Sequence, residues 1–172
     1  MAEESHLSLS QHWVTVKDEK TGLLVEFPRT PLEMTFEVPF QNTPPTGHIH
    51  LYSVPTQKGL LALSSFHCST VDTDMLQKEN LYQFFERILV PHFFFNPAVF
   101  QNHQVFHFKR IKFDSQEAVS FQFSFQDHEI EKKLEGIALI KKQTLYIPFY
   151  LASVKDFDQK ILEHFLNSIQ IP

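Results

Sequence analysis

The sequence has too few cysteines and glycines for several kinds of functional site. Its 172 residues include one cysteine and four glycines. A single cysteine cannot form an internal disulfide, so we expect the hydrophobic core alone to hold the fold. The glycines are scattered at positions 22, 47, 59 and 136. Phosphate-binding loops and dinucleotide-binding fingerprints need clustered glycines, and the GxSxG elbow of serine hydrolases is absent as well. The sequence therefore argues against all three.

Long apolar runs and positive charge near the start are also missing. No segment reaches the roughly 18 apolar residues of a membrane-spanning helix. The most apolar stretch, from Ile88 to Phe100, is interrupted by Pro91 and Pro97. The N-terminus carries two glutamates where a signal peptide carries positive charge, and no apolar region follows them. We therefore expect a cytoplasmic protein without a membrane span.

Length and charge narrow the possibilities further. One domain is expected, because about 150 residues per domain is usual. We predict a flexible N-terminus over residues 1–11 and a single α+β domain over residues 12–172. The net charge is −5 with the histidines counted as neutral. A mildly acidic chain gives no general electrostatic argument for binding nucleic acid, so we predict no nucleic-acid partner.

Alternating apolar and polar residues predict strands over most of the chain. Three pairs of these strands should form antiparallel hairpins: 12–16 with 23–27, 47–55 with 60–66, and 134–142 with 144–151. Proline removes a donor from a sheet ladder, so we expect Pro148 to lie in an edge or bulged strand. The predicted strands cover residues 12–16, 23–27, 33–38 (at most a short edge strand), 47–55, 60–66, 105–113, 118–126, 134–142 and 144–151.

Two segments have the spacing of a helix instead. Apolar residues at positions 81, 84, 85 and 88 form one stripe, and those at 157, 161, 162, 165 and 169 form another. We expect Ser153 or Asp156 to cap the second helix. This order of strands and helices predicts an antiparallel α+β sandwich, with helices packed on the faces of the sheet.

Several short segments resemble the PsbP-like superfamily. Trp13 and residues 23–28 are similar to its opening tryptophan and apolar strand. The late strand at 136–140, the Leu-Tyr strand at 144–146 and the terminal helix at 165–169 are similar to its closing motifs. The resemblance implies an α/β/α sandwich and a protein-binding role without catalysis. Fold analogy does not identify a partner.

Ten histidines raise the question of a metal site. His48 and His50 are two residues apart, so a strand places both on one face. His103 and His107 have helical spacing, but the pattern around them predicts a strand. The sequence has no HExxH motif and no cysteine pair. We therefore predict no metal and no cofactor, and leave one hypothesis open: His48 and His50 with a third ligand from another strand.

The remaining catalytic combinations favour structural interpretations. His67 and Cys68 are neighbours on a predicted strand and should face opposite ways, so we expect Cys68 to be a buried, inert thiol. Carboxylate pairs and clusters of basic residues should be solvated charge or helix caps, although the basic clusters also suit an acidic partner surface. The carboxylate pairs are Glu129 with Glu131 and Asp156 with Asp158, and the clearest basic cluster is Lys109, Arg110 and Lys112.

Phenylalanine is abundant, with 19 residues. Phe121, Phe123 and Phe125 alternate along a strand, which predicts an ordinary core face. A second group lies between two prolines, and a segment kept irregular by proline cannot easily bury every ring. We predict that this group binds a partner. Its members are Phe93, Phe94, Phe95 and Phe100.

These observations favour a non-enzymatic protein-binding or chaperone-like module with an apolar, Phe-rich surface. Its partner would be another protein or an apolar peptide, and the pattern is also compatible with a homodimer through an edge strand. The alternative is a small-molecule or metal-binding sensor that uses the His-rich strands. An unrecognised hydrolase ranks last, because no catalytic motif supports it.

Overall fold

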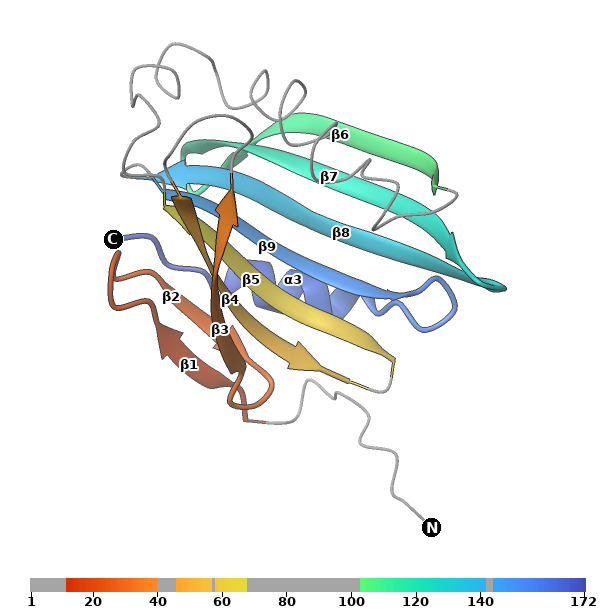
Figure 1. Cartoon of the computed structure of the whole chain (residues 1–172), viewed down its shortest axis with the longest axis horizontal. Coiled ribbons are helices and arrows are strands. Elements are labelled where there is room, and N and C mark those ends of the chain that lie inside the picture. The colour runs from red at the N-terminus through yellow and green to blue at the C-terminus, as the bar shows by residue number, and fades with distance from the viewer. Residues whose placement is uncertain (1–11, 40–45, 57, 68–102, 142–143) are drawn as a thin grey trace.

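The structure, a computed structural model, describes residues 12–39, 46–56, 58–67, 103–141 and 144–172 (Figure 1). These residues form nine strands and one helix. The elements are β1 (Val14–Lys17), β2 (Leu24–Phe27), β3 (Leu32–Pro39), β4 (Thr46–Pro55), β5 (Gly59–His67), β6 (His103–Phe113), β7 (Gln116–Asp127), β8 (Ile130–Lys141), β9 (Thr144–Ser153) and α3 (Gln159–Asn167).

The strands are arranged in two antiparallel sheets. Seven of them form one large sheet in the order β3-β4-β5-β9-β8-β7-β6. The β1–β2 hairpin forms a separate two-stranded sheet. The three predicted hairpins are confirmed, since β1 pairs with β2, β4 with β5, and β8 with β9. The segment predicted as a short edge strand is β3, which lies at the edge but has eight residues.

One face of the large sheet is covered by α3 and the β1–β2 hairpin. Figure 1 shows α3 crossing the sheet behind β9, with the hairpin at the lower left. The helix contributes Ile161, Leu162 and Phe165, whose spacing follows the predicted stripe. Phe27 of the hairpin packs against Phe165, with ring centroids 5.2 Å apart. The tyrosines of β9, Tyr146 and Tyr150, are buried in the same core.

The opposite face holds a second core, which is rich in phenylalanine. Phe121, Phe123 and Phe125 project from one side of β7 and are all buried. The rings of Phe123 and Phe125 stack at a centroid distance of 5.4 Å. Leu134 of β8 and Leu145 of β9 belong to the same cluster. This confirms that the alternation in β7 marks a core face, although burial of the whole second face could not be inferred from one strand.

The predicted fold class, a sheet flanked by helices in an α/β/α sandwich, is wrong. The described residues are mostly strands, and the single helix among them lies on one face of the sheet. The strands are longer than predicted: β8, for example, begins at Ile130 instead of residue 134. The small β1–β2 sheet also provides cover that the prediction assigned to a helix. The expected helix over 81–88 and the expected flexible segment 1–11 lie outside the described residues.

The position of Pro148 also differs from the expectation. β9 lies between β5 and β8, so Pro148 is in a central strand, and its pairing with β5 continues through Leu63 without a shift. On the other side, the recorded pairing with β8 passes from Gly136–Phe149 to Leu139–Tyr146 in constant register. Proline has no N–H for the ladder. Gly136 lets the two backbones approach, because a Cβ at this position would lie 2.2 Å from the Pro148 carbonyl oxygen.

We therefore expect Gly136→Ala to destabilise the protein. The added methyl group would overlap the backbone of Pro148 and Phe149, and overpacking of this kind costs about 1–3 kcal/mol. The free energy of unfolding can be measured with urea, using the fluorescence of Trp13. Gln122→Ala is a suitable control, because Gln122 is exposed on the adjacent strand β7. Equal stability of Gly136→Ala and the wild type would contradict the close packing of β8 and β9.

Candidate functional site

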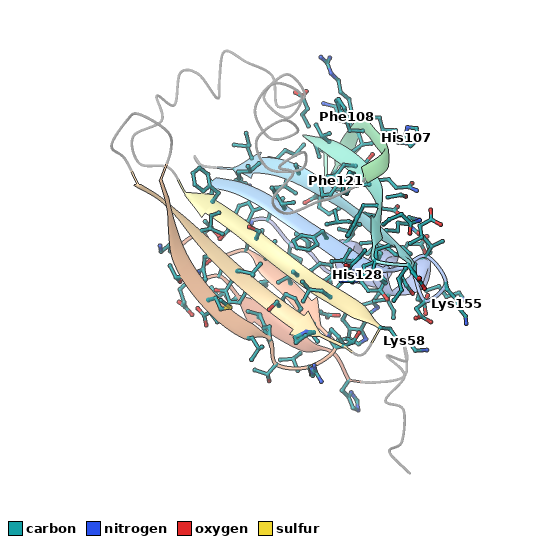
Figure 2. The ribbon with its side chains drawn as sticks, turned by 45° about the vertical axis from the view of Figure 1, so that its right-hand side comes forward. Lys58, His107, Phe108, Phe121, His128 and Lys155 are labelled. Carbon is teal, nitrogen blue, oxygen red and sulfur yellow. The ribbon has the colours of Figure 1, made fainter. Side chains whose placement is uncertain are left out.

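An open pocket of about 890 Å³ lies at one end of the large sheet. Three segments far apart in the sequence meet there: the β4–β5 turn, the β7–β8 turn, and the chain that leaves β9 toward α3. Figure 2 shows Lys58 and Lys155 close to each other at this end, with His128 near them. We call this site the end pocket. It is lined by residues 56, 58–60, 129–132 and 151–156.

Local hydrogen bonds fix the walls of the end pocket. In the β4–β5 turn, the Thr56 hydroxyl accepts a hydrogen bond from the Gly59 amide at 2.9 Å. The Val154 amide donates to the Glu131 carbonyl at 2.9 Å, which joins the chain after β9 to the start of β8. His128 occupies a left-handed conformation, with φ of 56°, at the tip of the β7–β8 turn. Turns held by hydrogen bonds therefore form the walls of the pocket.

The floor of the end pocket is apolar. Leu60 and Leu151 are half-buried register partners on β5 and β9. Ile130 is 53% exposed and Val154 is 45% exposed, although both are large aliphatic residues. An exposed aliphatic residue is common on its own, but several that line one concave surface are typical of a binding site.

The rim of the end pocket carries charges of both signs. Lys132 Nζ lies 2.5 Å from Asp127 Oδ2, and the hydrogen bond from Lys132 holds the pKa of the Asp127 carboxyl below its ordinary value. Lys58 and Lys155 are exposed, and none of the described carboxylates forms an ion pair with either of them. The side chains of these two lysines are therefore open to solvent.

A buried polar network lies on the opposite face of the sheet, beneath the β1–β2 hairpin. Asp18 is only 4% exposed and accepts hydrogen bonds from the Thr21 hydroxyl and, at 3.4 Å, from the Tyr146 hydroxyl. Burial is the main cause that raises the pKa of both Tyr52 and Tyr146 to about 12, and the charge of Asp18 adds to it. Because Asp18 and Tyr146 join the hairpin to β9, we interpret this network as structural.

The predicted partner-binding residues Phe93, Phe94, Phe95 and Phe100 lie outside the described residues. Their role stays a prediction, and the same holds for the buried thiol of Cys68.

The two histidine pairs of the sequence analysis lie on two strands of the sheet. His48 and His50 lie on β4. His103 and His107 lie on β6, which confirms the prediction that they belong to a strand. His50 Nε2 is 2.7 Å from Glu33 Oε1 on the neighbouring strand β3. Among the side chains that the structure describes, no three histidine, cysteine or acidic groups gather closely enough to hold a metal ion.

The residues of the predicted carboxylate pairs have different structural roles. Asp158 caps α3, and its side chain accepts a hydrogen bond from the Lys160 amide at 3.0 Å. The cap was expected at Ser153 or Asp156. These two residues instead bond to each other, with the Ser153 hydroxyl 2.9 Å from Asp156 Oδ2. Glu129 is exposed on the rim of the end pocket.

The three residues of the basic cluster on β6 are all exposed: Lys109, Arg110 and Lys112.

Sequence reasoning missed the end pocket, because three turns form it and no single motif contains it. The one available signal was Ile130, an isolated aliphatic residue among charged neighbours.

Comparison with known proteins shows the fold. No protein-family model and no curated protein matches the chain. The solution structure of cyanobacterial PsbP from Synechocystis is similar over 96% of this chain and 95% of that chain, with 11% identity and a TM-score of 0.56. The fold is therefore PsbP-like, as the sequence motifs predicted. A crystal structure of a Pseudomonas aeruginosa protein of unknown function also matches, over 84% of this chain and 85% of that chain. Its identity is 10% and its TM-score is 0.35, which is too low to support an argument.

The described part of the chain contains no helix of sufficient length and apolar character to cross a membrane.

The buried tyrosines predict how stability depends on pH. An unfolded tyrosine ionises near pH 10, whereas Tyr52 and Tyr146 stay protonated in the folded state until about pH 12. Between these values the unfolded state loses protons and the folded state does not, so stability should fall as the pH rises from 10 to 12. Urea unfolding at a series of pH values measures this decline.

The variant Tyr146→Phe should reduce the alkaline loss of stability. It should also be about 1 kcal/mol less stable than the wild type at pH 8, because the hydrogen bond to Asp18 is lost. An equal slope between pH 10 and 12 in the variant and the wild type would contradict the raised pKa of Tyr146.

Proposed function

We propose that this chain is a non-enzymatic protein-binding module and that its end pocket receives apolar side chains of a partner protein. The observation that carries the proposal is the exposure of Ile130 and Val154 at the open surface of this pocket. Solvent contact of these side chains is unfavourable, so covering them would stabilise a complex. An extended segment of a protein, with aliphatic side chains, matches this surface.

The rigidity of the floor supports the proposal. The floor residues Leu60 and Leu151 belong to a row that continues through Leu134 to Phe123, one residue from each of four adjacent strands. Phe123 is fully buried in the Phe-rich core, which anchors the row. A preformed apolar floor reduces the entropy that is lost on binding.

The charged rim supports a protein partner over a small molecule. Sites for small molecules enclose most of their ligand, whereas the end pocket lies open between turns. Lys58 and Lys155 suit acidic groups that flank the apolar segment of a partner. Glu129 on the same rim would disfavour acidic groups placed near it, so the rim can select the orientation of the partner.

The absence of catalysis is part of the proposal. Within the described part of the chain, the tyrosines with raised pKa belong to the core on the other face. The lowered pKa of Asp127 has an ordinary cause in its ion pair with Lys132. A perturbed acid and base facing one cavity, the arrangement typical of an active site, is not found among these groups.

Several finer predictions belong to the same proposal. We propose a cytoplasmic location, a chaperone-like role and no nucleic-acid partner, on the sequence arguments given above. The partner contact predicted for Phe93, Phe94, Phe95 and Phe100 is kept as a separate part of the proposal. The homodimer through an edge strand would use β3 or β6, which lie at the two edges of the large sheet.

A photocrosslinking residue at position 130 tests the proposal in cells that make the protein. We expect a specific protein adduct when the crosslinker replaces Ile130, and none when it replaces Val14. Val14 is the matched control, because it is 37% exposed on β1 and does not line the end pocket. Equal adducts at both positions would contradict the assignment of the site.

Binding of the purified partner then tests the energetics. Ile130→Ser and Val154→Ser should each weaken the affinity about tenfold, because loss of a buried contact of about 1.4 kcal/mol changes Kd by that factor. Val14→Ser should leave the affinity unchanged. Unchanged affinity in both pocket variants would refute the proposed site. A co-purified small molecule lost from Ile130→Ser, seen by native mass spectrometry, would instead show that the end pocket holds a small molecule.

A further inference from the structure

The two edges of the large sheet differ in the residues that they expose. β3 and β6 lie at opposite borders of the sheet (Figure 1), and within the described residues each is paired with one strand only. β6 exposes Lys109, Arg110 and Lys112. Charged side chains, lysine above all, are a common means by which proteins prevent an edge strand from pairing with another chain. The β6 edge is therefore protected.

β3 lacks this protection in the part whose side chains the structure describes, residues 32–35. Leu32 is 59% exposed and Met34 is 55% exposed, and their spacing places both on one face of the sheet. Glu33 carries the only charge in this part. Its Oε1 atom is 2.7 Å from Nε2 of His50 on the neighbouring strand β4, so the carboxylate is directed away from the open edge. An unguarded edge with exposed apolar side chains can accept another strand.

A second copy of this chain fits the open edge of β3. Two copies related by a two-fold axis pair antiparallel, and the residue on the axis then lies opposite its own copy. An axis at Glu33 would place two carboxylates opposite each other, which destabilises a sheet. An axis at Met34 instead places two apolar side chains opposite each other, and each Glu33 opposite the neutral Thr35 of the other copy. The charge and the apolar residues of this edge therefore suit a copy of itself.

We infer that two copies of this chain pair through β3, with the two-fold axis at Met34, so that their large sheets join into one. The inference specifies the homodimer of the proposed function and is independent of the end pocket. Main-chain hydrogen bonds and the cover of Leu32 and Met34 supply the affinity. The assembly ends at two copies, because both outer edges are then the basic β6 edges. The interface is small, so the dimer should be weak and should depend on concentration.

Cysteine cross-linking tests the position of the axis, in a Cys68→Ser background whose folding is checked by circular dichroism. Met34→Cys should give a covalent dimer on oxidation, because residues paired across antiparallel strands have Cα atoms about 4.5–5.5 Å apart, which a disulfide can span. Glu33→Cys and Thr35→Cys should each stay monomeric alone and should cross-link when they are mixed. Lys109→Cys is the matched control, because Lys109 is exposed on the other edge strand, and it should give no dimer.

Analytical ultracentrifugation tests the dimer without a cross-link. We expect the wild type to shift from monomer to dimer as its concentration rises through the micromolar range. Met34→Lys should weaken association about tenfold, because it places two positive charges together at the axis. Thr35→Lys should strengthen association several-fold, because each lysine would lie opposite Glu33 of the other copy. Ile130→Ser, which changes an exposed aliphatic residue of the end pocket, should associate as the wild type does.

Three results would overturn the inference. They are a wild type that stays monomeric at millimolar concentration, unchanged association in the folded variant Met34→Lys, and equal cross-linking of Met34→Cys and Lys109→Cys. Cross-linking of Thr35→Cys alone would contradict the axis at Met34. Each of these failures would leave the end pocket in place, since the adduct expected at position 130 does not depend on β3.

Discussion

The antiparallel register of β5, β9 and β8 is the constraint on which the rest of the structure depends. Adjacent side chains of a strand point to opposite faces, so a slip of one residue would exchange the two faces along its whole length. β9 shows the consequence directly: Tyr146 and Tyr150 enter the core under α3, and Leu145 enters the Phe-rich core. The approach of Gly136 to Pro148 fits only one alignment of β8 and β9.

The same register determines the floor of the end pocket. It places Leu60 of β5 beside Leu151 of β9, and Leu151 beside Leu134 of β8. The end pocket therefore rests on hydrogen-bonded strands of the large sheet.

Most of the strands could be predicted from the sequence, because the alternation of apolar and polar residues is a local signal. Phe121, Phe123 and Phe125 identified a core face correctly, and the PsbP-like motifs agreed with the structural comparison. The sequence analysis predicted helices on both faces of the sheet, because local patterns do not reveal that the β1–β2 hairpin covers part of one face. Pro148 was misplaced for a similar reason: the central position of its strand depends on the pairing of β9 with both β5 and β8, which are distant in the sequence.

The candidate site was less predictable, because it is assembled from distant segments. The end pocket needs the turns near Lys58, Ile130 and Val154 to meet, and no motif encodes that meeting.

Cross-strand nuclear Overhauser effects would test the register most directly. The account predicts contacts that pair residue 60 with residue 151 and residue 134 with residue 151. Contacts shifted by one residue, pairing 60 with 150 or 134 with 150, would contradict it and remove the basis of the end pocket.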